Sequence, residues 1–347
     1  MAVAIPGLAP VAAALIQMQG PALEAGVLTG SIALPLERAR HGDTPVLTFR
    51  SPTGSGASGA TGGATVGATG AATVRFLLDT GASSSLLSPA LVARLSLSSR
   101  VIPLRQFALA GAGEGCGAVQ PRRARLPLLT AGGPGSARLS LSGAEVLVLP
   151  VAGLPADVDG VLGAPQLRQL PLWVDPRGGQ LAFGPAALRL AAEASRGDSA
   201  GRRPVTHALR WQRGVPLMAL PLAAVPGQPA APLSVPALAD TGAEGLFLTP
   251  GLTARLMPVG PSRPLRVAGF CGEESARWAP MLGPHLLPLP GHGGHLPAPV
   301  QAITTANPVF EALGVEAIVG QELLRSHPQL WRLDATPPLL RLWPTRP

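Results

Sequence analysis

The chain has 347 residues, with 43 glycines, 40 prolines and a formal net charge of +8. Its length allows two domains of ordinary size, and the many turn residues between short apolar runs favour an all-β architecture. The lack of lysine excludes P-loop and Schiff-base chemistry, and two cysteines are too few for a disulfide framework or a cysteine-rich metal site. The arginines are scattered, without a basic run or interleaved aromatic residues, which argues against nucleic-acid binding.

The first 28 residues are expected to form an N-terminal extension. Residues 2–16 are apolar enough for the core of a signal peptide, but no lysine or arginine precedes them and two prolines interrupt the run. An extension or a first strand is therefore favoured over a cleaved signal, and a cytoplasmic over an exported location. The presence of a pro-segment within residues 1–28 stays open. No other run reaches the length of a membrane span.

The first domain is predicted over residues 29–190. Residues 28–36 and 45–50 indicate short strands. Residues 51–72 are almost wholly Gly, Ala, Ser and Thr, which is typical of a flexible loop with nothing to bury. Because a compact hairpin occupies the equivalent place in the second half, we interpret this tract as an expanded hairpin loop.

An apolar strand over residues 73–78 leads into the first Asp-Thr-Gly, at residues 79–81. A helix is predicted to begin at Ser88-Pro89, because a hydroxyl residue is a good N-cap and proline suits the first helical position. Thr249-Pro250 gives the same signal in the second half.

A linker is predicted at residues 191–204, where charged residues interrupt the apolar pattern. The second domain, residues 205–347, then repeats the order of the first. Strands are expected over residues 215–225 and 233–239, and the second strand leads into Asp-Thr-Gly at residues 240–242.

The two halves are copies of one another. Residues 79–95 align without a gap to residues 240–256, and ten of these seventeen positions are identical: 79–82, 87, 89, 91 and 93–95 of the first copy. Later in each copy, residues 161–163 correspond to residues 318–320. This long offset indicates duplication of a whole domain and excludes a short-period solenoid.

A glycine-rich hairpin is predicted in each copy between the Asp-Thr-Gly and the later segment. Such tips are typical of mobile β-hairpins that close over a ligand, here called flaps. The charges of Glu114, Glu273 and Glu274 are expected to be solvated. Cys116 and Cys271 either pack as small hydrophobes or, if the flaps meet, form a disulfide. The hairpins span residues 107–119 and 265–276, and the flap candidates are Gly111, Gly113, Glu114, Gly269, Phe270 and Cys271.

Two carboxylates on matching turns can share one proton and activate a water. The glycine two positions after each aspartate lets the backbone approach, so that its N–H can donate to the carboxylate. Each threonine hydroxyl is expected to bond the backbone of the other copy. If the copies pack about a pseudo-two-fold axis, the two aspartates meet at its centre. The candidates are catalytic Asp79 and Asp240, supported by Thr80, Gly81, Ala82, Thr241, Gly242 and Ala243.

The sequence resembles the retropepsin-like aspartic peptidases. Asp-Thr-Gly-Ala-Ser at residues 79–83 is typical of that family's catalytic turn, as is the later segment at residues 159–164; residues 240–244 and 316–320 resemble the pattern less closely. The resemblance implies two homologous acid-protease β-barrel lobes related by a pseudo-two-fold axis, with short helices after each Asp-Thr-Gly and each late apolar-Gly segment. Both halves lie in one chain, as in pepsins, so a monomer should suffice.

Two positions depart from the family pattern. Retroviral members usually pair an aspartate after Asp-Thr-Gly-Ala with an arginine after the late glycine. Here the corresponding pairs are Ser83 with Ala164 and Glu244 with Gln321, so this ion pair is absent. With no tyrosine in the chain, the flap tyrosine of pepsins also has no counterpart.

These features predict an aspartic endopeptidase that cleaves extended peptides or unfolded proteins at acidic to near-neutral pH. No cofactor, metal, nucleic acid or membrane span is predicted. The alternative is a catalytically inactive relative that binds peptides or protein partners. Both Asp-Thr-Gly motifs are intact, which favours the enzyme because a binding module needs no matched dyad.

Overall fold

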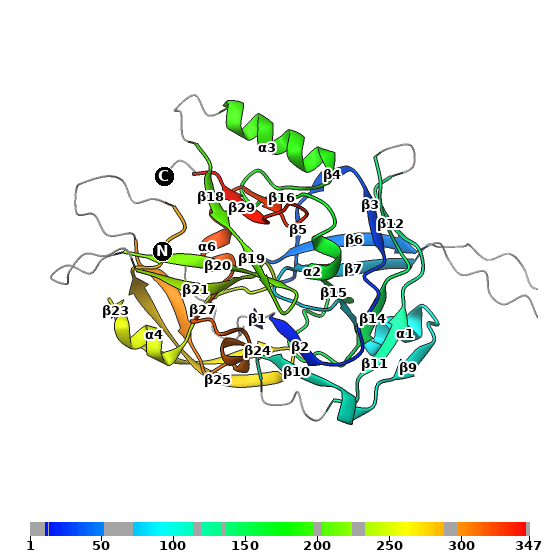
Figure 1. The fold of residues 1–347 in the computed structure, drawn as a ribbon, viewed down its shortest axis with the longest axis horizontal. Helices are drawn as coiled ribbons and strands as arrows, with labels where there is room; N and C mark the ends of the chain where they lie inside the picture. The colour runs from blue at the N-terminus through cyan, green and yellow to red at the C-terminus, as the bar shows by residue number, and fades with distance from the viewer. Residues whose placement is uncertain are drawn as a thin grey trace, which may run out of the picture.

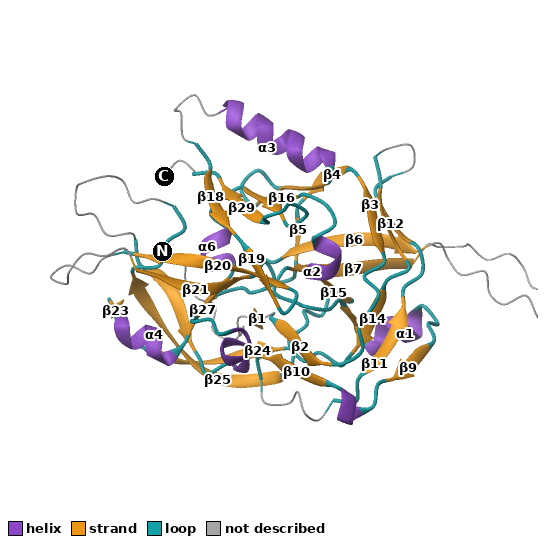
Figure 2. Ribbon diagram, viewed as in Figure 1, coloured by secondary structure: helices purple, strands orange, loops and turns teal. Residues whose placement is uncertain are grey.

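The computed structural model describes residues 11–12, 14–51, 72–113, 119–133, 137–197, 203–223, 233–287 and 298–344. Two β-rich lobes lie side by side, with the first half of the chain on one side and the second half on the other (Figure 1). Strands dominate both lobes and most helices are short (Figure 2). The prediction of an all-β protein with two homologous lobes is confirmed.

The first lobe is a curled sheet formed by eleven strands of the described chain: β3 (Val27–Gly30), β5 (Glu37–Arg38), β6 (Pro45–Ser51), β7 (Ala72–Asp79), β8 (Leu86–Leu87), β9 (Ser99–Val101), β11 (Arg122–Arg125), β12 (Leu129–Ala131), β13 (Leu139–Ser142), β14 (Glu145–Val148) and β15 (Gly160–Gly163). Their order is β3-β13-β12-β6-β7-β15-β8-β14-β11-β9, and β5 pairs with β6. The single strand expected over residues 28–36 is divided in two: residues 27–30 form β3 in this sheet, whereas residues 32–35 form a separate strand in the third sheet.

The second lobe is a sheet of ten strands within the described residues: β1 (Val11–Ala12), β19 (Arg210–Gln212), β20 (Val215–Leu222), β21 (Leu233–Ala239), β22 (Leu246–Leu248), β23 (Met257–Pro258), β24 (Arg263–Gly269), β25 (Gly272–Leu282), β26 (Val300–Thr304) and β27 (Ala317–Val319). Their order is β1-β24-β25-β26-β22-β27-β21-β20-β19, and β23 pairs with β25.

The centres of the two sheets have the same connectivity. In the first lobe β7 runs antiparallel to β6 and parallel to β15, which in turn pairs antiparallel with β8. In the second lobe β21 has the same relation to β20 and β27, and β27 to β22. The strands β15 and β27 are buried along their whole length. This explains their unbroken apolar sequence, because strands covered on both faces do not alternate.

A third sheet joins the lobes. Its six strands, counted over the described chain, are β4 (Ile32–Pro35), β16 (Leu172–Asp175), β17 (Gln180–Phe183), β18 (Val205–Ala208), β28 (Gln329–Arg332) and β29 (Leu339–Leu342), in the order β18-β29-β28-β16-β17-β4. The lobes meet where β16 pairs with β28, so that Leu172 lies opposite Trp331.

Helix α3 (Pro185–Gly197) packs on this joining sheet and corrects one boundary. We predicted a linker from residue 191, but residues 191–197 continue the helix. Ala187 and Ala191 are four residues apart and therefore share one helix face, which is buried in a cluster with Trp173 and Trp343. Glu193 and Arg196, two of the charged residues that suggested a linker, are exposed on this helix, and residues 198–202 lie outside the described residues.

The remaining helices are short. Ser88 and Thr249 are N-caps, as predicted, and accept hydrogen bonds from the amides of Leu91 and Leu252 at 3.2 and 3.1 Å. The bounds are α1 (Pro89–Arg94), α2 (Ala164–Leu167), α4 (Pro250–Arg255), α5 (Pro308–Leu313), α6 (Gln321–Leu324) and a 3-10 turn over Leu104–Gln106.

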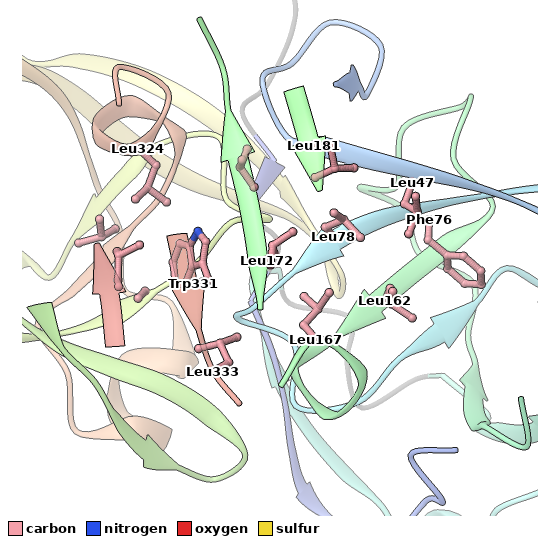
Figure 3. Packing of buried hydrophobic residues seen from close by; sticks show 14 of the residues in the cluster. Leu47, Phe76, Leu78, Leu162, Leu167, Leu172, Leu181, Leu324, Trp331 and Leu333 are labelled. Atoms are coloured by element: carbon pink, nitrogen blue, oxygen red, sulfur yellow. The ribbon is translucent and has the colours of Figure 1, made fainter. Parts of the chain in front are cut away.

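A hydrophobic core runs without interruption from one lobe to the other. Leu47, Phe76 and Leu162 lie within the first lobe, Leu324 and Trp331 lie on the second-lobe side, and Leu172 lies between them (Figure 3). One face of the joining sheet therefore belongs to this core, and α3 packs on the other face.

The hairpins that precede both aspartates are confirmed. Ser51 pairs with Ala72 at the ends of β6 and β7, and Leu222 pairs with Leu233 in the second lobe. The loops between them, residues 52–71 and 224–232, lie outside the described residues. Within the described residues, no helix is both long and apolar enough to cross a membrane.

Candidate active site

Both aspartates lie at the ends of central strands. Asp79 is the last residue of β7, and Asp240 directly follows β21. The amide of Asp240 donates to the carbonyl of Val319 at 3.0 Å, while Asp79 pairs with Gly163 in the parallel ladder. Each motif is thus fixed by its late apolar-Gly segment. Both side chains are completely buried.

The two threonines interlock the turns, as predicted. Thr80 Oγ1 accepts the Thr241 amide at 3.0 Å, and Thr241 Oγ1 accepts the Thr80 amide at 3.0 Å. Each hydroxyl also donates across the interface, from Thr80 to the carbonyl of Ala239 at 2.7 Å and from Thr241 to that of Leu78 at 2.8 Å. Four buried hydrogen bonds therefore hold the turns in a nearly symmetric arrangement.

The glycines allow the backbone to approach a carboxyl group. A Cβ on Gly81 would lie 2.4 Å from Cγ of Asp240, so the carboxyl of the second copy rests against the turn of the first. The amides of Gly242 and Ala243 donate to Asp240 Oδ1 at 2.8 and 3.2 Å. The predicted donation from the glycine is thus present in the second turn.

The environment raises the pKa of both aspartates. Burial raises the pKa of Asp79 well above 3.8, and the charge of Asp240 and a hydrogen bond between the two carboxyls raise it further. Burial also raises the pKa of Asp240, to about 6, while the hydrogen bond from Asp79 and nearby backbone amides oppose that rise. The arrangement favours a proton on Asp79 and the negative charge on Asp240.

Three carboxyl oxygens of the pair lack donors. Among the described residues outside the pair, no donor meets Asp79 Oδ1, Asp79 Oδ2 or Asp240 Oδ2 with hydrogen-bond geometry. The amides of Gly81 and Ala82 lower the pKa of Asp79 without forming such a bond. Buried polar oxygens normally have partners, so this cluster requires a proton and suits a polar ligand.

The alanines after each motif anchor the short helices behind the site. The carbonyls of Ala82 and Ala243 accept the amides of Ala164 and Gln321 at 2.9 and 2.8 Å. Gln321 Nε2 also donates to the carbonyl of Thr241 at 2.7 Å. Gln321, which follows the late glycine of the second copy, therefore supports the second turn directly.

The residue that follows Asp-Thr-Gly-Ala makes different contacts in the two copies. Glu244 accepts the amides of Asp43 and Thr44, each at 2.8 Å, as well as the Thr44 hydroxyl. Ser83 Oγ accepts the amide of Gln17 at 2.8 Å. Sequence reasoning missed both contacts, because the partners lie far apart in the chain and carry no motif.

The second flap has the predicted hairpin form. Its strands β24 and β25 pair up to Gly269 opposite Gly272, with Phe270 and Cys271 at the tip. Both tip side chains are buried, because the tip packs against the first flap: the Cys271 amide donates to the carbonyl of Ala112 at 2.8 Å. The two flaps therefore meet, as the disulfide hypothesis required.

The first flap differs from its prediction. Its strand β10 (Ala108–Gly111) pairs antiparallel with an N-terminal strand, β2 (Leu15–Gln19), in the described part of the chain. Gly113 has a left-handed φ of 104° and lies against Cys271. Glu114 and Cys116 lie outside the described residues. Cys271 is disulfide-bonded, and its pairing with Cys116 stays a prediction.

The prediction that Glu274 is solvated is wrong. Its side chain is buried and accepts the Thr305 hydroxyl at 2.6 Å and the Gly113 amide at 3.2 Å. The carboxylate thus joins the second flap to the first, and hydrogen bonds compensate for its burial. Glu273 is exposed as predicted, and lies 3.0 Å from Arg266.

Comparison with known proteins finds a family match in the first lobe. Residues 64–165 match the aspartyl protease family model. This aspartyl protease match covers the first motif, the first flap and the first late segment, all in the first lobe. No curated protein sequence matches the chain.

Two solved structures of similar fold are plant seed proteins. The basic 7S globulin from soybean has 10% sequence identity and a TM-score of 0.45, with coverage of 90% of this chain and 94% of the globulin. Conglutin gamma, a basic 7S globulin from lupine seeds, has 10% identity and a TM-score of 0.47, with coverage of 91% and 95%.

Proposed function

We propose that this protein is an aspartic endopeptidase that hydrolyses peptide bonds with a water activated by Asp79 and Asp240. The observation that carries the proposal is the single buried pair of carboxyls, held by interlocked turns from two lobes, with three oxygens lacking donors. A binding protein gains nothing from burying two carboxyls together, because their ionisation is costly there. The aspartyl protease match over residues 64–165 supports the same reaction class.

The asymmetry of the pair assigns the two roles in the proposal. Asp240, whose Oδ1 accepts two amides, holds the negative charge and takes a proton from water. The resulting hydroxide attacks the peptide carbonyl while protonated Asp79 donates to the carbonyl oxygen. The tetrahedral intermediate then collapses: the C–N bond breaks, the amine nitrogen receives the proton held by Asp240, and Asp79 regains its own. No covalent enzyme intermediate forms.

The proposal is tested by the Asp79→Asn and Asp240→Asn variants with an unfolded protein as substrate. Because the dyad is covered in the resting chain, the assay uses long incubation and excess substrate from pH 4 to pH 8. Each variant should lose at least about 100-fold of the hydrolysis rate, the usual contribution of an acid or base. Asp334→Asn, at an exposed aspartate, is the control. Equal rates in the native chain and Asp79→Asn would defeat the mechanism.

The second candidate is a catalytically inactive peptide-binding module. The complete burial of both carboxyls favours it, because a working site must admit water and substrate. This candidate predicts that a hydroxyethylene peptide, a non-cleavable mimic of the tetrahedral intermediate, binds no more tightly than the corresponding ordinary peptide. An enzyme binds such an analogue at least about 100-fold more tightly.

A further inference from the structure

An N-terminal segment, residues 14–19, lies along the turn of the first aspartate. The Leu15 amide donates to the carbonyl of Gly81 at 3.2 Å, and the Ser83 amide donates to the carbonyl of Leu15 at 2.8 Å. Leu15 and Ala82 thereby form a parallel bridge. The Gln17 amide continues the contact by donating to Ser83 Oγ at 2.8 Å. One edge of the segment thus takes up the backbone groups beside the dyad.

The other edge of the segment is bound by the first flap. Strand β2 pairs with β10 so that Gly111 lies opposite Leu15 and Leu109 opposite Gln17. Just before the segment, Val11 and Ala12 pair with β24 of the second flap. The N-terminal strands β1 and β2 lie among β10 and β24 in the same region of the molecule (Figure 1).

Successive side chains of the segment enter different lobes. Leu15 is buried in the cluster that contains Ala82, Leu86 and Phe270, mainly of the first lobe. Ile16 is buried in the cluster that contains Ala243, mainly of the second lobe. This alternation is the expected result of an extended strand crossing between two lobes, because neighbouring side chains point to opposite sides.

We propose that residues 14–19 occupy the place of a substrate strand, so that the resting protein is closed and peptides must displace this segment. This inference rests on the proposed function for the identity of the displaced ligand. A peptide that reaches the dyad needs backbone partners on both edges, and the free groups of Gly81, Ser83 and β10 are those that the segment uses. The segment also lies along the turn that carries Asp79, whose side chain is completely buried.

The sequence of residues 14–19 indicates which peptides could bind in their place. Leu15 and Ile16 are consecutive, fully buried aliphatic side chains, one directed to each lobe. We therefore expect substrates that are extended and carry two adjacent aliphatic residues. Because the segment is tethered, its effective concentration at the site is on the order of millimolar. A free peptide must therefore compete with the segment at that concentration to bind beside the dyad.

The test uses the full chain carrying Leu15→Asp and a hydroxyethylene peptide as the probe. A carboxylate in the apolar site of Leu15 should expel the segment, so the variant should bind the probe at least about 10-fold more tightly than the native chain. Val27→Asp, at an exposed valine in the next strand, should bind it as the native chain does. Equal affinity of the native and Leu15→Asp chains would overturn the inference.

A second variant covers the case in which Leu15→Asp does not fold. A recognition sequence for a specific protease is inserted after Gly20, where the chain is exposed, and the folded protein is then cut. Cutting removes the tether, so the probe should bind at least about 10-fold more tightly, and the peptide Ala-Leu-Ile-Gln-Met-Gln should compete with it. Unchanged probe affinity after cutting would also overturn the inference.

Failure of the proposed function gives a different result. Tight probe binding by the opened chain without any peptide hydrolysis would contradict the proposed peptidase activity, but the inference that residues 14–19 close the site would still hold. If the native chain hydrolyses peptides as fast as Leu15→Asp does, the inference that residues 14–19 close the site is contradicted, and the proposed peptidase activity still holds.

Discussion

At the scale of single residues, the burial of the two aspartates makes the stability of the folded chain depend on pH. Each carboxyl is buried without full hydrogen bonding, which raises its pKa and penalises its charged form. The folded protein holds a proton that the unfolded chain releases at lower pH. The free energy of unfolding should therefore fall as the pH rises from about 3.8 towards 6, where Asp240 ionises in the folded state.

The Asp240→Asn variant should remove this loss. Below about pH 3.8 both states of the native protein carry the proton, so the substitution should have little effect there. At pH 7 it should raise the free energy of unfolding by up to about 3 kcal/mol, the equivalent of the shift from 3.8 to about 6. Urea unfolding between pH 4 and pH 7 measures this, with Asp334→Asn as the control. If Asp240→Asn raised the free energy of unfolding by the same amount at every pH, this prediction would be contradicted.

At the scale of elements, the flaps are tied to each other across the site. The Cys271 amide of the second flap donates to the carbonyl of Ala112 in the first flap at 2.8 Å. The Gly153 amide, from the segment between β14 and β15, also holds the second flap by donating to the carbonyl of Gly269 at 3.2 Å. Glu274 adds a buried carboxylate contact from β25 to Gly113. Two adjacent glutamates on β25 thus have opposite environments, because successive side chains of a strand point to opposite faces.

The Glu274→Ala and Glu273→Ala variants should separate these environments. Glu274→Ala leaves the Thr305 hydroxyl and the Gly113 amide without their acceptor, at a cost of about 1–3 kcal/mol in the free energy of unfolding. Glu273→Ala removes an exposed ion pair with Arg266 and should cost less than about 0.5 kcal/mol. Urea unfolding of the two variants at pH 7 gives the comparison. Equal costs would contradict the buried contact.

At the scale of the whole molecule, the lobes form one cooperative structure. The joining sheet pairs β16 with β28, and one hydrophobic core spans the two lobes (Figure 3). The interlocked threonines add a second connection at the site. Lobes that share a core and a sheet should not unfold separately, because opening one exposes the apolar surface of the other.

Trp331→Ala should therefore destabilise both lobes together. Trp331 is fully buried where the lobes meet, so its truncation should cost about 3–5 kcal/mol. Far-UV circular dichroism and tryptophan fluorescence should still give coincident urea transitions. Trp278→Ala, at a half-buried tryptophan beneath Arg263 in the second lobe, should cost less. A separate early transition of one lobe in Trp331→Ala would contradict the shared core.

The amino-acid sequence by itself determined the duplication, the two Asp-Thr-Gly turns, the capped helices after them and the second flap hairpin. Each of these is encoded locally: a strand that ends in a turn needs glycine, and a helix that starts at Ser88-Pro89 needs only its own residues. The meeting of Asp79 and Asp240 also followed, because a matched pair of domains has one natural symmetric packing.

Only the tertiary structure decided which groups surround the pair. Glu274 became buried because Thr305 and Gly113 came within reach of it. Glu244 found its donors at Asp43 and Thr44, about two hundred residues earlier in the chain. Strand β2 bound the first flap through backbone groups, which every residue carries. Such contacts join distant segments through geometry and leave no pattern in the sequence of either one, so they follow only from the folded arrangement.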